Sequence, residues 1–153
     1  MEFTAQDYNR LGEERYNAGD IEGAKGAFEK AAAIDSKLSI ALNNLGIISL
    51  HEHNLDDAFR YFLKANEFDP ADLNILSNLV TCGSELGLWA TIIGAVEHSL
   101  SFHPENADLL FILGSCYLRM DQKKRARELL GRCLQIQPEF DEAKRLLEQL
   151  KRE

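Results

Sequence analysis

The three prolines of the chain are evenly spaced, because Pro70, Pro104 and Pro138 follow one another at one constant interval. Proline lacks a backbone N–H and is poorly tolerated inside a helix, so regularly spaced prolines indicate regularly spaced helix ends. A constant period between about 20 and 50 residues is typical of proteins built from stacked structural repeats. The spacing therefore predicts a repeat protein.

Division of the chain at this period gives four units that align without a gap. One position is leucine in all four units, as Leu11, Leu45, Leu79 and Leu113. Small residues, such as Gly46, recur at further shared positions and would let two helices approach closely. The predicted organisation is a single domain, 1–153, with repeats 5–38, 39–72, 73–106 and 107–140 and a capping helix over 141–153. The polar face of that last segment favours a natural end of the array.

Each repeat predicts two helices joined by a short polar turn. In the second repeat, apolar residues are three and four residues apart, which is the spacing of one helix face, as in Ala41, Leu42, Leu45 and Ile48. Asp20 and Asn54 lie at turns and are suited to cap the second helices, because their side chains accept hydrogen bonds from free backbone N–H groups. The fold class predicted is therefore all-α, made of antiparallel helix pairs.

The second repeat resembles the tetratricopeptide repeat family most closely. The resemblance covers 136 of the 153 residues, and in the second repeat it is carried by Leu45, Gly46, Ala58, Phe62, Ala65, Asp69 and Pro70. It implies a right-handed α-solenoid, the superhelix of this family, with first helices on the concave face and second helices on the convex face. It also implies a non-catalytic scaffold that binds a partner protein or peptide.

In that family, particular positions of the first helices face the concave groove. Asn44 and Asn78 occupy one such position in consecutive repeats, where family members bind the backbone of an extended peptide. An amide side chain offers both a donor and an acceptor to a peptide group. Apolar residues would then provide selectivity. The groove residues implied are Asn9, Arg10, Asn43, Asn44, Ile47, Leu50, Asn74, Asn78, Thr81, Phe111, Ile112, Ser115 and Arg119.

A co-chaperone-type adaptor is a disfavoured alternative. Family members of that kind hold a terminal carboxylate with cations and asparagines at set groove positions. The matching residues are Asn9, Glu13, Asn44, Asn74 and Asn78, so only Asn44 agrees and every cationic position lacks its cation. Glu13 would repel a carboxylate.

Charge is unevenly distributed along the chain, whose formal net charge is −8. Residues 1–76 hold 14 acids and 7 bases, whereas residues 119–132 hold 6 bases and 2 acids. The basic run is either a solvated face or a surface for an acidic partner, and the latter reading assigns Lys123, Lys124, Arg125 and Arg127. A second copy could supply the acid, so the alternative function is a self-associating assembly module that uses its end surfaces and complementary charge. The acidic balance argues against a nucleic-acid partner.

Motifs for catalysis, cofactors or metals are not found in the sequence. Cys82, Cys116 and Cys133 have no metal-ligand spacing and are interpreted as buried free thiols, which fits a reducing, cytoplasmic location. A third hypothesis places a metal or catalytic role at His51 and His53, but residues two apart on a helix do not face each other. No apolar run reaches the roughly 18 residues of a membrane span, so no membrane insertion is expected.

The third repeat departs most from the pattern. Val80 and Ile92 replace small residues, Gly83 stands where the fourth repeat has a tyrosine, and Gly94 falls inside a predicted helix. The changes in side-chain volume partly compensate, which favours simple repacking. The other interpretation is a functional bend or a soft joint in the array. Trp89 shares its position with apolar residues and is interpreted as packing.

Overall fold

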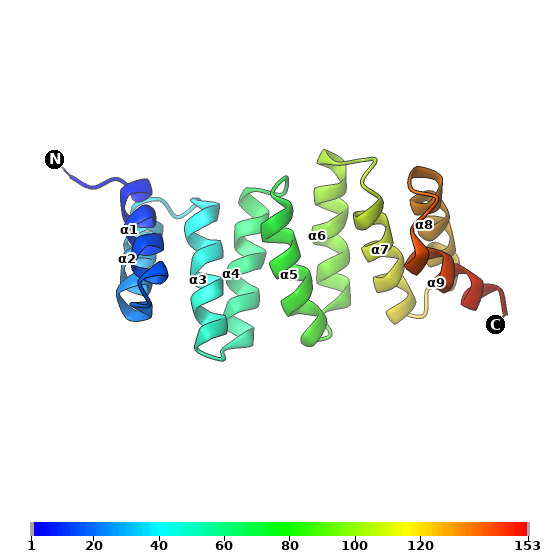
Figure 1. Ribbon diagram of the computed structural model, residues 1–153, viewed down its shortest axis with the longest axis horizontal. Helices are drawn as coiled ribbons and strands as arrows, with labels where there is room; N and C mark the ends of the chain where they lie inside the picture. The colour runs from blue at the N-terminus through cyan, green and yellow to red at the C-terminus, as the bar shows by residue number, and fades with distance from the viewer. Residues whose placement is uncertain (1, 153) are drawn as a thin grey trace. The chain divides into compact units, whose positions relative to one another are not determined.

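A computed structural model describes residues 2–152, and within them the chain forms helices and no strands. First helices begin at residues 5, 39, 73 and 107, and second helices at 21, 55, 89 and 123, so both kinds recur with the period of the prolines. The predicted all-α fold of helix pairs is confirmed (Figure 1). The helices are α1 (Ala5–Asn17), α2 (Ile21–Ile34), α3 (Ser39–His51), α4 (Leu55–Phe68), α5 (Leu73–Glu85), α6 (Trp89–Phe102), α7 (Ala107–Arg119), α8 (Lys123–Ile136) and α9 (Asp141–Arg152).

The chain divides into two compact units, which we call unit 1 (Met1–Cys82) and unit 2 (Gly83–Glu153). In unit 1, α1 packs against α2, α2 against α3, and α3 against α4. In unit 2, α6 packs against α7, α7 against α8, and α8 against α9. The division falls inside α5, in the third repeat, where the sequence departs from the repeat pattern. The single-domain organisation stays a prediction.

Side chains at the turns start several helices, as the sequence predicts. Oδ1 of Asp20 accepts a hydrogen bond from the backbone N–H of residue 23 at 2.9 Å, and this begins α2. Asn54 accepts from the N–H of residue 57 at 3.1 Å, and Asn106 from that of residue 109 at 3.0 Å. Thr4 and Asp7 form a capping box at α1, in which each side chain accepts from the other residue's N–H.

Glycines in the first helices let aromatic rings of the second helices come close. Phe62 is completely buried, and a Cβ added at Gly46 would lie 2.5 Å from its ring. Gly12 meets the ring of Phe28 in the same way. The second helix of one repeat also packs against the first helix of the next, since Phe28 clusters with Leu45 of α3. This packing fixes how the first helices of unit 1 lie beside one another.

Helix α9 packs against α8 through one face. Ala143 and Leu150 of α9 are buried. Nη2 of Arg127 in α8 donates a hydrogen bond to the backbone carbonyl of Leu150 at 2.6 Å. Because the last carbonyls of a helix have no partner inside the helix, a cation there satisfies one of them and complements the helix dipole.

The turns inside the repeats share a backbone requirement at one position. The residues there are Gly19, His53, Gly87 and Asp121, which have φ angles of +81°, +58°, +70° and +56°. They stand at the same alignment position of the four repeats. Glycine adopts positive φ at no steric cost, whereas a side chain is strained there. Two of the four repeats therefore carry a strained residue at this turn.

We expect His53→Gly and Asp121→Gly each to raise the free energy of unfolding by roughly 0.5–1 kcal/mol. Glycine relieves the strain of positive φ in the folded state, and the greater entropy that it gives the unfolded chain offsets part of this stabilisation. Gly19→Ala, at the matching turn, should lower it by a similar amount. Urea unfolding followed by circular dichroism measures all three. Changes of the same sign at residues 19 and 53 would contradict the shared requirement.

Candidate functional site

Asparagine side chains connect consecutive first helices of unit 1. Nδ2 of Asn44 in α3 donates to Oδ1 of Asn9 in α1 at 3.1 Å. Nδ2 of Asn78 in α5 donates to Oδ1 of Asn43 in α3 at 2.9 Å. The two bonds have the same direction and the same separation of 35 residues. We call Asn9, Asn43, Asn44 and Asn78 the asparagine ladder.

The asparagine ladder leaves the side-chain carbonyl oxygens of Asn44 and Asn78 without a hydrogen-bond donor from the described residues. Asn9 is buried, and its Nδ2 donates in turn to Oε1 of Glu13 at 2.8 Å. Among the residues that the structure describes, no group donates to Oδ1 of Asn44 or of Asn78. Each amide nitrogen has donated one of its two hydrogens to a neighbouring side chain, so the carbonyl oxygen and the second N–H are the groups that an extended ligand would meet.

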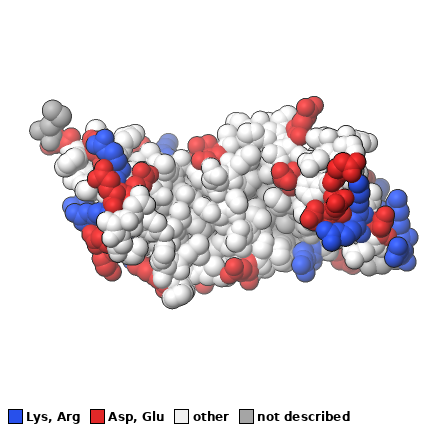
Figure 2. Space-filling view, viewed as in Figure 1, with Lys and Arg blue, Asp and Glu red and all other residues white. Residues whose placement is uncertain are grey.

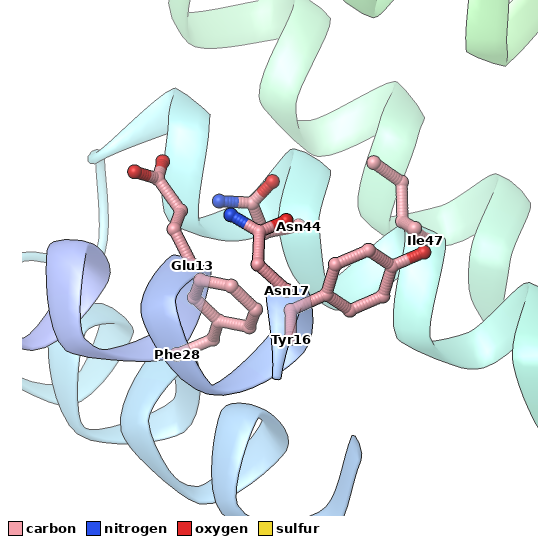
Figure 3. Close-up of a pocket in the computed structure, with 6 residues that line it drawn as sticks. All are labelled: Glu13, Tyr16, Asn17, Phe28, Asn44 and Ile47. Carbon is pink, nitrogen blue, oxygen red and sulfur yellow. The ribbon is translucent and has the colours of Figure 1, made fainter. Parts of the chain in front are cut away.

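A pocket of about 180 Å³ lies beside Asn44. Figure 3 shows its lining, with Glu13 at one end and the Tyr16 ring and Ile47 at the other. The wall is aromatic and aliphatic, and four of its side chains carry polar groups. The lining residues are Glu13, Tyr16, Asn17, Phe28, Asn44 and Ile47.

Tyr16 and His51 form a second link between α1 and α3. The hydroxyl of Tyr16 lies 2.6 Å from Nε2 of His51, and the two rings meet edge to face at 5.4 Å. These residues are also 35 positions apart. His51 therefore contacts a tyrosine, while His53 lies in the turn. In residues 2–152 no group of three histidine, cysteine or acidic side chains is arranged to hold a metal ion.

The other sequence-predicted groove residues of unit 1 lie outside the ladder. Arg10 is exposed, and its guanidinium pairs with Asp7 at 3.2 Å. Leu50, Asn74 and Thr81 are exposed. The ladder and the pocket thus contain five of the predicted groove residues, which are Asn9, Asn43, Asn44, Ile47 and Asn78. Arg10 instead pairs with a residue of its own helix.

The four groove residues predicted in unit 2 all lie on α7. Phe111 stacks on Phe140, with ring centroids 4.9 Å apart, so the chain entering α9 contacts this predicted anchor. Arg119 lies over the ring of Trp89 at 5.6 Å. The interpretation of the tryptophan as packing stays a prediction. Ile112 and Ser115 are half-buried.

Arg127 and Arg125, which are predicted to bind an acidic partner, form contacts within unit 2. Arg127 donates to the carbonyl of Leu150, as described above. Nη1 of Arg125 donates to the hydroxyl of Tyr117 at 3.1 Å, and its guanidinium lies over that ring. Lys123 and Lys124 are exposed at the start of α8. Figure 2 shows lysines and arginines over α8 and α9 with acidic residues beside them.

Tyr117 of α7 connects two charged side chains from neighbouring helices of unit 2. Its hydroxyl donates to Oε1 of Glu97 in α6 at 2.9 Å while it accepts from Arg125 of α8. Burial raises the pKa of Tyr117 most, and the bond to Glu97 adds to the shift, while Arg125 opposes it. This arrangement gives Arg125 a structural role, which sequence reasoning did not identify.

The three cysteines form no disulfide in the described structure and are buried, as predicted. Burial raises the pKa of the Cys116 thiol to about 11, although the positive charge of Arg119 acts in the opposite direction. Burial also raises the pKa of Cys133, and the carboxylate of Asp108 contributes. A thiol with a raised pKa is a poor nucleophile at neutral pH, because the thiolate is the reactive form.

We expect Cys116 and Cys133 to react slowly with a disulfide reagent at about pH 8 in the native protein and rapidly after unfolding in urea. The contribution of Cys116 to the free energy of unfolding should be constant below about pH 9, the ordinary pKa of a thiol. It should fall as the pH rises towards 11, because the folded state holds the Cys116 proton more tightly. The absorbance of the thiolate that the disulfide reagent releases measures the reaction rates. Equal rates in native and unfolded protein would contradict the burial of these thiols.

Over the described part of the chain, no helix is both long enough and apolar enough to cross a membrane.

Helix pairs that recur with a constant period and present one polar face define an α-helical repeat protein. Models of the tetratricopeptide repeat match residues 9–72 and 93–151, which together make up more than half of the chain. The chain belongs to the tetratricopeptide repeat family, whose members are generally non-catalytic protein-interaction modules. No curated protein sequence matches it significantly.

Solved structures share this fold at low sequence identity. A crystal structure of MamA has a TM-score of 0.72 and 21% identity, with 92% of this chain and 82% of that chain covered. A tetratricopeptide repeat protein from Parabacteroides merdae has a TM-score of 0.75 and 19% identity, with coverage of 96% and 60%. PilF from Pseudomonas aeruginosa has a TM-score of 0.66 and 21% identity, with coverage of 95% and 67%. These similarities establish the fold.

Proposed function

We propose that the chain is a non-catalytic interaction module that binds an extended segment of a partner protein along the first-helix face of unit 1. The observation that carries this proposal is the asparagine ladder. It holds Asn44 and Asn78 in fixed orientations and leaves the carbonyl oxygen of each without a protein donor among the described residues. An extended peptide offers backbone N–H groups that can donate to such oxygens.

Preorganisation supports the same proposal. Side chains that are already held by hydrogen bonds lose little conformational freedom when a ligand binds. The pocket beside Asn44 supplies an apolar surface next to these acceptors, as expected for a site in which backbone contacts give affinity and a side-chain pocket gives selectivity. The fold is also similar to that of a chain in the crystal structure of the APC/C hetero-tetramer Cut9–Hcn1, with a TM-score of 0.65 and 21% identity over 96% of this chain and 30% of that chain.

Peptide selection followed by amide chemical-shift mapping tests the proposal. A random peptide library displayed on phage is selected against the wild-type protein, and the enriched peptide is titrated into ¹⁵N-labelled protein. We expect the largest shifts at residues of α1, α3 and α5 that flank the asparagine ladder. Shifts confined to α2 and α4 would place binding on the other side of the helix pairs and would contradict the proposal.

A further inference from the structure

The pocket beside the asparagine ladder contains a carboxylate that no cation of the protein neutralises. Among the described residues, neither lysine nor arginine forms an ion pair with Glu13. The cations of α1 are engaged elsewhere, since Arg10 pairs with Asp7 at 3.2 Å and Arg15 with Asp20 at 3.9 Å. The charge of Glu13 is therefore available to a ligand.

Hydrogen bonds inside the protein give the pocket its polarity. Asn44 donates to Asn9, and Asn9 donates to Oε1 of Glu13. This chain of bonds holds the carboxylate in place from one side. The acceptors it leaves free are Oε2 of Glu13 and Oδ1 of Asn44, which lie beside the second N–H of Asn44 and the amide of Asn17. Among the lining residues, Glu13 alone carries a formal charge. The pocket is therefore suited to a group that donates hydrogen bonds and carries positive charge.

The size and the walls of the pocket suit one long side chain. Its volume of about 180 Å³ exceeds the roughly 150 Å³ in which an engineered protein cavity binds benzene. Tyr16, Phe28 and Ile47 form an apolar wall leading to Glu13 (Figure 3). Lysine and arginine place an apolar stem along such a surface and keep the charged head in water. The ring of Tyr16 adds a favourable contact for a cation.

We propose that this pocket binds a lysine or arginine side chain of the partner segment, whose charged head pairs with Glu13 and donates to Oδ1 of Asn44. The inference rests on the proposed function, because the basic side chain belongs to the peptide that lies along the ladder. The charge of the surrounding sequence favours it, since residues 1–76 hold 14 acids and 7 bases. Such an excess attracts a basic segment over long range.

Peptide pools that differ at one fixed position test the inference. Three fluorescein-labelled pools carry lysine, norleucine or glutamate at the centre of otherwise random short sequences, and fluorescence polarisation measures their affinity. Norleucine keeps the stem of lysine and lacks its ammonium group. We expect the lysine pool to bind about tenfold more tightly than the norleucine pool, and the glutamate pool to bind most weakly.

Two variants of α1 distinguish an ion pair inside the pocket from long-range attraction by the net charge of the protein. Glu13→Gln keeps the shape of the side chain and should remove the preference for lysine over norleucine. Glu14→Gln makes the same change in net charge at an exposed neighbour that does not line the pocket, and it should keep the preference. Circular dichroism confirms that both variants are folded.

The outcomes distinguish this inference from the proposed function. Equal binding of the lysine and norleucine pools to wild-type protein would overturn the basic pocket and leave the peptide-binding face intact. An equal loss of preference in the Glu13 and Glu14 variants would also overturn it, because long-range charge would then explain the selectivity. Binding of none of the three pools would contradict the proposed function itself.

Discussion

Gly46→Ala is expected to lower the free energy of unfolding by about 1–3 kcal/mol, the range found for overpacked cores. The added methyl group would lie 2.5 Å from the ring of Phe62, which is completely buried and cannot move without disturbing the core. The higher helix propensity of alanine opposes this loss by about 1 kcal/mol. Urea unfolding followed by circular dichroism measures the net effect.

The matched control is Gly26→Ala in α2. Nothing lies within 4 Å of a Cβ added at Gly26, so the substitution should raise the free energy of unfolding by up to about 1 kcal/mol through helix propensity alone. The two glycine substitutions are therefore predicted to have opposite signs. A stabilising Gly46→Ala would show that the first and second helices of the repeat are packed less closely than described.

Asn9→Ala is expected to lower the free energy of unfolding by about 1–3 kcal/mol, which is typical when a buried polar group loses its partner. Asn9 is only 6% exposed, and it connects Asn44 to Glu13 through one accepted and one donated hydrogen bond. Its removal leaves the amide of Asn44 without an acceptor and the Glu13 carboxylate without its donor. Thermal and urea unfolding measure the loss.

Asn17→Ala is the control for the asparagine substitution. Asn17 is exposed at the end of α1 and forms no side-chain hydrogen bond in the described structure. Its replacement should change the free energy of unfolding by less than about 0.5 kcal/mol. Equal stability of the Asn9 and Asn17 variants would show that the ladder does not connect α1 to α3 in solution.

The helices and their caps could be predicted because they depend on local sequence. The apolar spacing around Leu45 and the capping residues Asp20 and Asn54 depend on residues of a single repeat, and the constant period reproduces this local pattern along the chain. The small residue at Gly46 also predicted a close approach of the two helices in a repeat. The structure confirms these helix starts and places the ring of Phe62 against this glycine.

Contacts between consecutive repeats could not be predicted from the repeat alignment. The alignment pairs equivalent positions of consecutive repeats. The side chains that meet between first helices are one residue further apart than equivalent positions are, as in Asn9–Asn44 and Tyr16–His51. Equivalent asparagines such as Asn44 and Asn78 therefore do not bond to each other. A search at a spacing of 35 would have found all three pairs in the sequence.

Charge alone also did not reveal that two basic residues of the fourth repeat form contacts within unit 2. Arg125 and Arg127 lie in a basic run, but one bonds to Tyr117 and the other to the last turn of α9. Both partners come from other helices, so no local pattern marks them. In α1, by contrast, the sequence indicated only that Glu13 would repel a carboxylate ligand. The structure was needed to show that no lysine or arginine of the described residues pairs with it.

The affinity of a selected peptide for the double variant Asn44→Ala with Asn78→Ala tests the central claim most directly. Asn9→Ala is the matched control, because it breaks the ladder and leaves both carbonyl acceptors in place. We predict that the double variant, measured at a temperature where all proteins are folded, binds at least about tenfold more weakly than wild type and clearly more weakly than Asn9→Ala. Unchanged affinity of the folded double variant would contradict peptide binding along this face.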